Sequence, residues 1–101
     1  MEKLIGQWQR PDGGYILEVR SVEPDGRITA AYFNPRPINV AKAEVSQIGA
    51  TVRIVIVLSD VNYPGSTYTL SYDAAGDVLR GTYFQAAIGQ TFDVYFVRRQ
   101  R

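Results

Sequence analysis

Apolar and polar residues alternate along most of the chain, and turn-forming residues interrupt this alternation about every eight to twelve residues. A period of two places successive side chains on opposite faces of a β-strand, whereas an amphipathic helix needs a period of about 3.6. No stretch shows the helical period, and no linker or low-complexity segment divides the chain. The sequence therefore predicts one all-β domain over residues 1–101.

The turn signals divide the chain into eight expected strands. Pro11-Asp12-Gly13-Gly14 and Glu23-Pro24-Asp25-Gly26 are strong turn sequences, and residues 59–65 are expected to form a longer loop. Because connections are short and sequential strands usually pair, we expect an eight-stranded antiparallel up-and-down meander barrel. The expected strands are 3–10, 15–22, 27–34, 40–48, 51–58, 66–72, 78–85 and 91–99.

The first expected strand contains Trp8, the only tryptophan, two residues after Gly6. A large ring in a first strand can plug one end of a barrel, and a nearby glycine lets a neighbouring backbone approach closely. We therefore expect Gly6 and Trp8 to take part in barrel closure.

Three short segments carry a family resemblance. Gly6-x-Trp8, residues 12–17 and residues 25–32 together resemble the opening of avidin-like barrels, which belong to the wider calycin group with lipocalins and fatty-acid-binding proteins. The match covers about the first third of the chain and an aromatic last strand that ends in arginine. The resemblance implies a ligand-binding barrel in which a basic residue of the last strand packs on the Trp8 ring. Since Phe92, Val94 and Phe96 alternate inward, Arg98 is the expected partner.

The resemblance does not extend to biotin binding. Tyr32 matches an inward ligand-contacting tyrosine, but the polar residues that avidins place after Gly-x-Trp fall near Arg10 and Gly14. The later ligand-stacking tryptophans are missing. The chain also vaguely resembles small exported bacterial proteins through residues 32–38 and 60–68, a likeness that implies no activity.

Catalytic chemistry has few candidate residues. The chain has no histidine and no cysteine, which excludes a thiol nucleophile, a Ser-His pair and a typical zinc site. Aspartates in turns usually cap their own backbone, so we expect no enzyme, no metal and no cofactor, with a carboxylate-based hydrolase as a minor alternative. The aspartates in expected turns are Asp12, Asp25, Asp60, Asp73 and Asp77.

Charge and hydropathy limit the partners. Eleven basic and ten acidic residues give a net charge of +1, so no global field attracts nucleic acid. No apolar run approaches the roughly twenty residues of a membrane-spanning helix. Residues 1–5 are too short for a signal peptide. We expect a periplasmic or exported protein if a signal has been removed, and a cytoplasmic one otherwise.

Inward polar and aromatic residues suggest a pocket for an apolar or aromatic small ligand near one mouth of the barrel. In the other interpretation these rings fill the interior completely and direct their hydroxyls to backbone or water. Both interpretations stay open at the level of sequence. The expected ligand-binding residues are Tyr32, Asn34, Asn62, Tyr63, Tyr68, Tyr83 and Gln85.

Outward apolar residues support a different kind of function. If they lie together, they form a surface for a homo-oligomer or a docking partner. The chain would then be a structural or interaction protein with a filled barrel. The residues of this expected surface are Val55, Val57, Phe84, Tyr95 and Val97.

Overall fold

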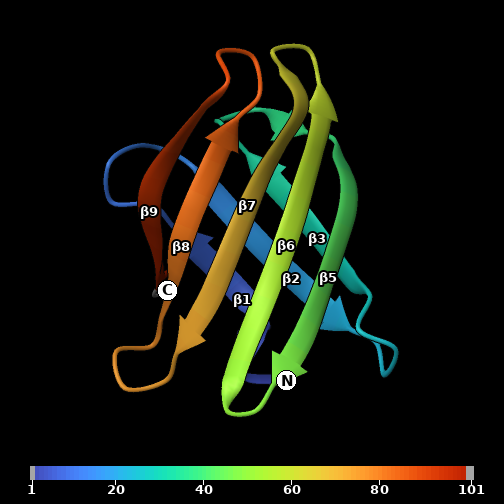
Figure 1. The fold of residues 1–101 in the computed structure, drawn as a ribbon, viewed down its shortest axis with the longest axis vertical. Helices are drawn as coiled ribbons and strands as arrows, with labels where there is room; N and C mark the ends of the chain where they lie inside the picture. The colour runs from blue at the N-terminus through green and yellow to red at the C-terminus, as the bar shows by residue number, and fades with distance from the viewer. Residues whose placement is uncertain (1, 100–101) are drawn as a thin grey trace.

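The structure, a computed structural model, describes residues 2–99 of the chain. These residues form a short 3-10 helix and nine antiparallel strands (Figure 1). The elements are η1 (Glu2–Leu4), β1 (Gly6–Gln9), β2 (Ile16–Val22), β3 (Ile28–Phe33), β4 (Pro37–Ile38), β5 (Val40–Ile48), β6 (Thr51–Asp60), β7 (Tyr63–Asp73), β8 (Val78–Gln85) and β9 (Gln90–Arg98).

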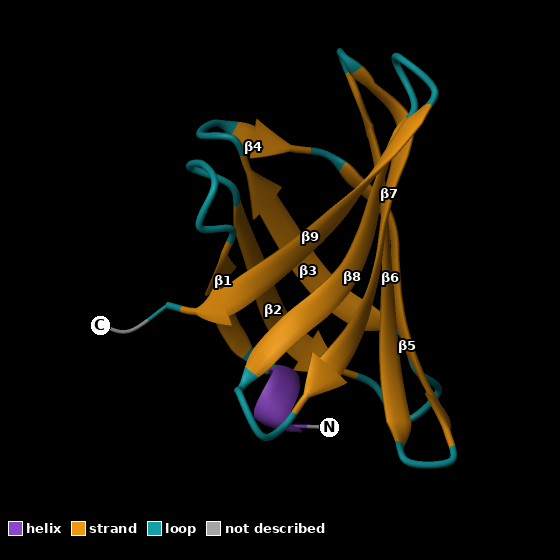
Figure 2. Ribbon diagram, turned by 60° about the vertical axis from the view of Figure 1, so that its left-hand side comes forward, coloured by secondary structure: helices purple, strands orange, loops and turns teal. Residues whose placement is uncertain are grey.

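All nine strands join one sheet in the order β4-β3-β2-β1-β9-β8-β7-β6-β5. Consecutive strands are neighbours except for β4 and β5, which lie at the two ends of this order. The first strand also pairs with the last, with Trp8 opposite Arg98. The sheet curls so that β2 and β3 lie behind β6–β8 (Figures 1 and 2). The expected all-β antiparallel meander is confirmed, in the form of a nearly closed barrel.

The expected count of eight strands is wrong because Pro37–Ile38 forms an additional strand. The sequence Asn34-Pro35-Arg36-Pro37 predicts a loop or an edge, since proline cannot donate to a β-ladder. The chain turns at residues 34–36 and lies back on β3 as an edge strand, with Ile38 opposite Tyr32. β4 and β5 are consequently the two edges of the sheet.

The two edge regions come together at a seam between β3 and β5. Arg27 and Glu44 form an isolated antiparallel bridge, and the Val45 amide donates to the Gly26 carbonyl over 2.7 Å. Gly26 has a φ of 92°, and a Cβ at this position would lie 2.6 Å from the Val45 carbonyl oxygen. The seam therefore depends on a close backbone approach that a larger residue would disturb.

The expected loop at residues 59–65 is also wrong. β6 continues to Asp60, β7 begins at Tyr63, and Val61-Asn62 forms a two-residue turn in which Asn62 has a φ of 70°. Gly65, with a φ of 86°, lies at a register shift within the ladder. The prediction failed because a tight turn and a β-bulge use the same residue types as a longer loop, so the three cannot be told apart from sequence.

The lower end of the barrel in Figure 2 is covered by η1. Residues 3 and 4, expected to begin the first strand, belong to this helical turn instead, and its Leu4 is fully buried. The Trp8 ring is also fully buried, and its Nε1 donates to the Leu4 carbonyl over 3.0 Å. The Arg98 guanidinium lies 4.2 Å from the centre of the Trp8 ring, the stacking that we expected.

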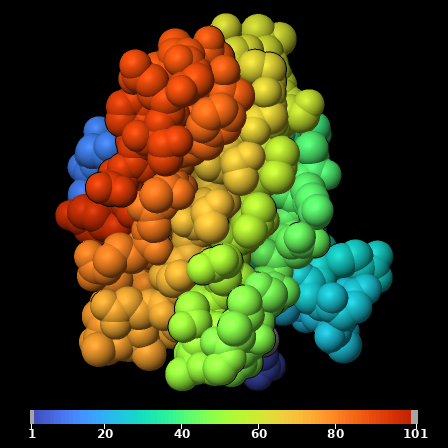
Figure 3. Space-filling view, viewed as in Figure 1, coloured from blue at the N-terminus to red at the C-terminus, as the bar shows by residue number. Residues whose placement is uncertain are grey.

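The interior follows the strand alternation. Val52, Ile54, Ile56 and Leu58 are buried, whereas Val55 and Val57 on the other face of β6 are half-buried. The outer surface of β5–β9 is seen in Figure 3, where side chains form a continuous wall. One core occupies the barrel, with Trp8 and Tyr72 in contact near its covered end and Tyr32, Tyr68 and Tyr83 packed together toward the mouth.

Candidate functional site

The uncovered end of the barrel carries a cleft with a volume of about 350 Å³. Its residues come from three strands, β7, β8 and β9, and from three connections. The hairpins that join β6 to β7 and β8 to β9 meet the 10–15 and 34–36 connections at this end (Figures 1 and 2). We call it the mouth cleft. It is lined by Arg10, Tyr15, Asn34, Asn62, Tyr63, Tyr83, Gln85 and Phe92.

Five of the seven residues expected to bind a ligand lie around this one cleft: Asn34, Asn62, Tyr63, Tyr83 and Gln85. They are up to 51 positions apart in the sequence (85 − 34), and the meander brings them together. Tyr32 and Tyr68 do not line the cleft, since they are 1% and 0% exposed and belong to the core.

Tyr32 and Tyr68 form a buried pair of phenols. Their hydroxyls are 2.7 Å apart, and the Tyr68 ring packs between Tyr83 and Phe96, at centroid distances of 4.4 and 5.2 Å. Burial raises the pKa of Tyr68 to about 12 and also raises that of Tyr32. Both phenols are therefore neutral at physiological pH and act as packed hydrogen-bonding groups.

Arg10 is a residue of the cleft that our reasoning from sequence missed. It is only 8% exposed, and its Nη1 donates to the Tyr68 hydroxyl over 2.9 Å. Nε and Nη2 both donate to the Asp12 carboxylate, over 2.9 and 2.6 Å. Arg10 has the same strand parity as the inward-facing Trp8, and this signal could have revealed it.

These contacts fix the charge states of both partners. Burial by itself would lower the pKa of Arg10, but the interactions with Asp12 and Tyr68 outweigh burial and raise it. The hydrogen bond from Arg10 lowers the pKa of Asp12. Arg10 and Asp12 therefore form an ion pair at neutral pH, with the carboxylate on the outer, more exposed side.

The 10–15 turn also positions an aromatic ring. Tyr15 places its ring 4.2 Å from the Arg10 guanidinium, and a Cβ at Gly13 would collide with that ring. Gly13 thus leaves the space that lets Tyr15 cover Arg10.

Two further polar groups meet across the cleft. The Asn34 Nδ2 donates to the Tyr63 hydroxyl over 2.6 Å and connects the end of β3 to the start of β7. The donation leaves the Tyr63 hydroxyl hydrogen and the Asn34 Oδ1 for other partners.

Phe92, which we expected to point into the barrel, is 42% exposed. It lies opposite Tyr83 on the ladder, near the hairpin that joins β8 to β9. Its ring therefore forms part of the rim of the cleft.

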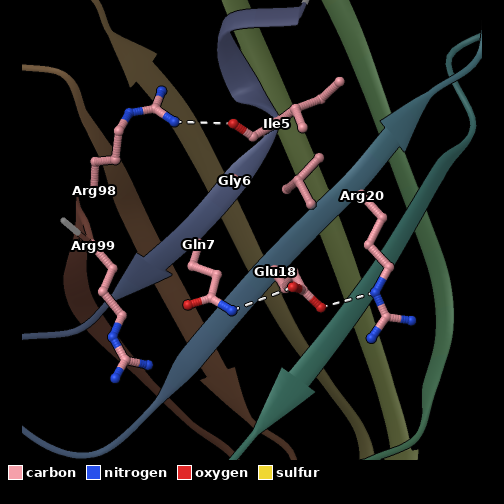
Figure 4. A pocket seen from close by; sticks show the side chains of 8 residues that line it. Ile5, Gly6, Gln7, Glu18, Arg20, Arg98 and Arg99 are labelled. Atoms are coloured by element: carbon pink, nitrogen blue, oxygen red, sulfur yellow. Dashed lines mark hydrogen bonds and ion pairs between the residues drawn. The ribbon is translucent and has the colours of Figure 1, made fainter. Parts of the chain in front are cut away.

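A second groove crosses the outside of β1 and β2 next to Arg98 (Figure 4). Its single carboxylate is occupied, because Gln7 and Arg20 both donate to Glu18, over 3.3 and 2.8 Å. Arg98 is similarly engaged with Asp77, over 2.7 Å, and with the Ile5 carbonyl, over 3.0 Å. This groove lies on the outer face of the sheet, is lined by three arginines and one glutamate, and contains none of the seven expected ligand-binding residues, so the mouth cleft is the better candidate for a ligand site.

The expected outer apolar surface does not form one patch. On the ladder, Thr67 and Thr69 of β7 lie between the valines of β6 and Phe84 of β8. Tyr95 lies opposite Arg80, apart from both. Self-association through Val55, Val57, Phe84, Tyr95 and Val97 stays a prediction.

Three of the aspartates expected in turns accept hydrogen bonds from backbone amides, although Asp60 lies at the end of β6 and reaches Asn39 of a distant segment. Asp25 accepts from the Arg27 amide, Asp60 from the amides of Asn39 and Val61, and Asp73 from that of Ala75. Across residues 2–99, no three acidic side chains gather in a way that could hold a metal ion.

The chain matches no protein-family model, no curated protein and no solved structure. Among the described residues, no helix has the length and apolar character needed to cross a membrane.

Proposed function

We propose that this chain is a non-enzymatic binding protein whose mouth cleft holds a small apolar or aromatic ligand. The observation that carries the proposal is the convergence of four aromatic rings and four polar side chains on one concave site at the uncovered end of the barrel. Ligand sites typically combine an apolar or aromatic lining with a few placed polar groups, and their volumes begin at about 300 Å³. The cleft is therefore of a size for a ligand of one or two rings.

We also propose that the chain is a calycin-like barrel, close in outline to the avidins. Support comes from the Trp8–Arg98 stack and from the helical turn that covers the same end. Biotin is not the proposed ligand, since Arg10 lies in the cleft at the position near which avidins place a polar biotin contact, and the additional tryptophans are missing.

A thermal-shift screen with indole, 1-naphthol, quinoline and biotin tests the proposal. A ligand that binds only the native state at about 100 times its Kd raises the stability by about 2.7 kcal/mol, so a true ligand should clearly raise Tm. We expect at least one aromatic compound to do so and biotin not to.

Titration calorimetry on two tyrosine variants then locates the site. Tyr63→Ala should weaken binding about tenfold, since a lost ring contact is worth about 1–1.5 kcal/mol. Tyr95→Ala removes an exposed ring from the outer wall and should leave the affinity unchanged. If no compound raises Tm, or if both variants bind equally well, the binding proposal is overturned and a structural or interaction role is favoured.

A further inference from the structure

The one cationic group of the mouth cleft is already neutralised by a carboxylate. Asp12 receives two of the five N–H groups of Arg10, and Tyr68 receives a third. The other lining residues are tyrosines, a phenylalanine and side-chain amides, all uncharged at neutral pH. The Arg10–Asp12 pair therefore gives the cleft no net charge.

Arg10 nevertheless keeps donor capacity. Two of its N–H groups, one on each terminal nitrogen, have no hydrogen-bond partner among residues 2–99. The Tyr63 hydroxyl hydrogen and the Gln85 amide add donors at the rim. A carbonyl oxygen can accept from such donors without bringing a charge of its own.

The rings around Arg10 favour a flat ligand. The Tyr15 ring centre lies 4.2 Å from the guanidinium carbon and that of Tyr83 lies 5.8 Å from it, so aromatic surface surrounds the same donors. Stacking on aromatic faces combined with in-plane hydrogen bonds is the usual way to hold a planar amide or lactam.

We propose that the mouth cleft selects a neutral planar ring that carries a carbonyl acceptor, such as an aromatic amide or a lactam, over the matching carboxylate. This inference rests on the proposed binding function and specifies its ligand class. A carboxylate would place a second negative charge beside Asp12 without an additional cation to offset it. The carbonyl of an amide accepts the same hydrogen bonds without that repulsion.

Matched probes on the same ring test the selectivity: 1-naphthamide against 1-naphthoate, and benzamide against benzoate. Equilibrium dialysis at pH 7 should give at least tenfold tighter binding of the amide in each pair. Tighter binding of the carboxylates by the unaltered protein would overturn the inference and leave the proposed binding function in place. Failure of every amide, carboxylate and aromatic probe to bind would overturn the binding function itself.

The variant Asp12→Asn tests whether the charge of Asp12 causes this selectivity. It keeps the size of the side chain and one carbonyl acceptor but leaves the charge of Arg10 without an anion. We expect the preference to reverse, with naphthoate binding improved at least tenfold.

Asp25→Asn is the control. It changes the net charge equally, in the turn between β2 and β3 at the far end of the barrel, and should keep the original preference for the amide. A folded Asp12→Asn protein that still prefers the amide contradicts the inference. If that variant does not fold, the ratio of amide to carboxylate affinity in the unaltered protein decides whether the cleft is selective.

Discussion

Two arginines occupy opposite ends of the barrel and use the same chemistry. Arg98 stacks on Trp8 at the covered end and pairs with Asp77, while Arg10 lies against Tyr15 at the mouth and pairs with Asp12. Arginine suits both places because its planar group can stack on a ring and donate to a carboxylate in the same plane. At the covered end the carbonyls of Lys3 and Ile5 take additional donors of Arg98. At the mouth Tyr68 takes only one such donor of Arg10, which leaves capacity for a ligand.

Because two phenols are buried, the free energy of unfolding should fall at alkaline pH. The pKa values of Tyr32 and Tyr68 are raised by burial above the ordinary value of about 10, so folding favours their neutral forms. The stabilisation is complete below about pH 10 and is lost as the pH rises above it. We expect phenolate absorbance to show that at least two of the seven tyrosines ionise only as the protein unfolds.

In guanidinium chloride all seven tyrosines should titrate together near pH 10. Tyr32→Phe keeps the ring and should remove one of the late-ionising groups. Reversible ionisation of all seven tyrosines in the native protein would contradict the burial of this pair.

At the scale of elements, the strands with clear alternation were the predictable ones. β5 and β8 have the predicted bounds of 40–48 and 78–85, since each lies between clear turn signals. Pro37–Ile38 was missed because proline predicts the absence of a strand, and only pairing with β3 makes these residues one. The helical turn at 2–4 was missed because three residues are too few to show a period.

The mouth cleft was predictable in part, because alternation along a strand shows which residues face inward. Strand parity assigned Tyr83 and Gln85 to the inner face, and the cleft contains both. Parity could not tell how deep each residue lies, so Tyr68 and Tyr83 were equivalent in sequence although only Tyr83 reaches the cleft. Arg10 was missed because a charged residue next to a turn is usually solvated.

One glycine allows β7 and β8 to approach closely. Gly81 lies on the inner face between Leu79 and Tyr83, and a Cβ there would collide with the Thr69 carbonyl of β7. We expect Gly81→Ala to destabilise the protein by about 3 kcal/mol or more, because the clash involves backbone and cannot relax by a side-chain rotation. Thermal unfolding should show this as a Tm lower by about 12 °C or more.

Gly14→Ala is the matched control for this substitution. A Cβ at Gly14 meets no heavy atom within 4 Å, so the stability should change by no more than about 0.5 kcal/mol. A Gly81→Ala protein with an unchanged Tm would show that the close approach of β7 and β8 is not required.

For the molecule as a whole, the seam between β3 and β5 decides how completely the barrel is closed. Neighbouring strands are joined by at least two register pairs, as between β1 and β9, and by seven or eight in β5–β9. The seam contains only the Arg27–Glu44 bridge and the bond from the Val45 amide to Gly26. Local opening needs the least free energy where the fewest hydrogen bonds and contacts must break. Hydrogen exchange should therefore be faster in β4 and β5 than in β6–β8.

Gly26→Ala should open the seam selectively. It places a Cβ 2.6 Å from the Val45 carbonyl oxygen at a φ of 92°, so both sterics and backbone strain oppose it. Gly49→Ala, at a φ of 61° with no atom within 4 Å, introduces backbone strain without the steric contact. We expect Gly26→Ala to accelerate exchange at Val45 and along β5 by at least tenfold, and Gly49→Ala to leave exchange at Val45 within about threefold of the unaltered protein. Because β6–β8 exchange only through more extensive opening, their protection should fall by a smaller factor than that of β5 in Gly26→Ala. An equal loss of protection in all strands would instead mean that the barrel opens as one cooperative unit, with the seam no weaker than the ladders.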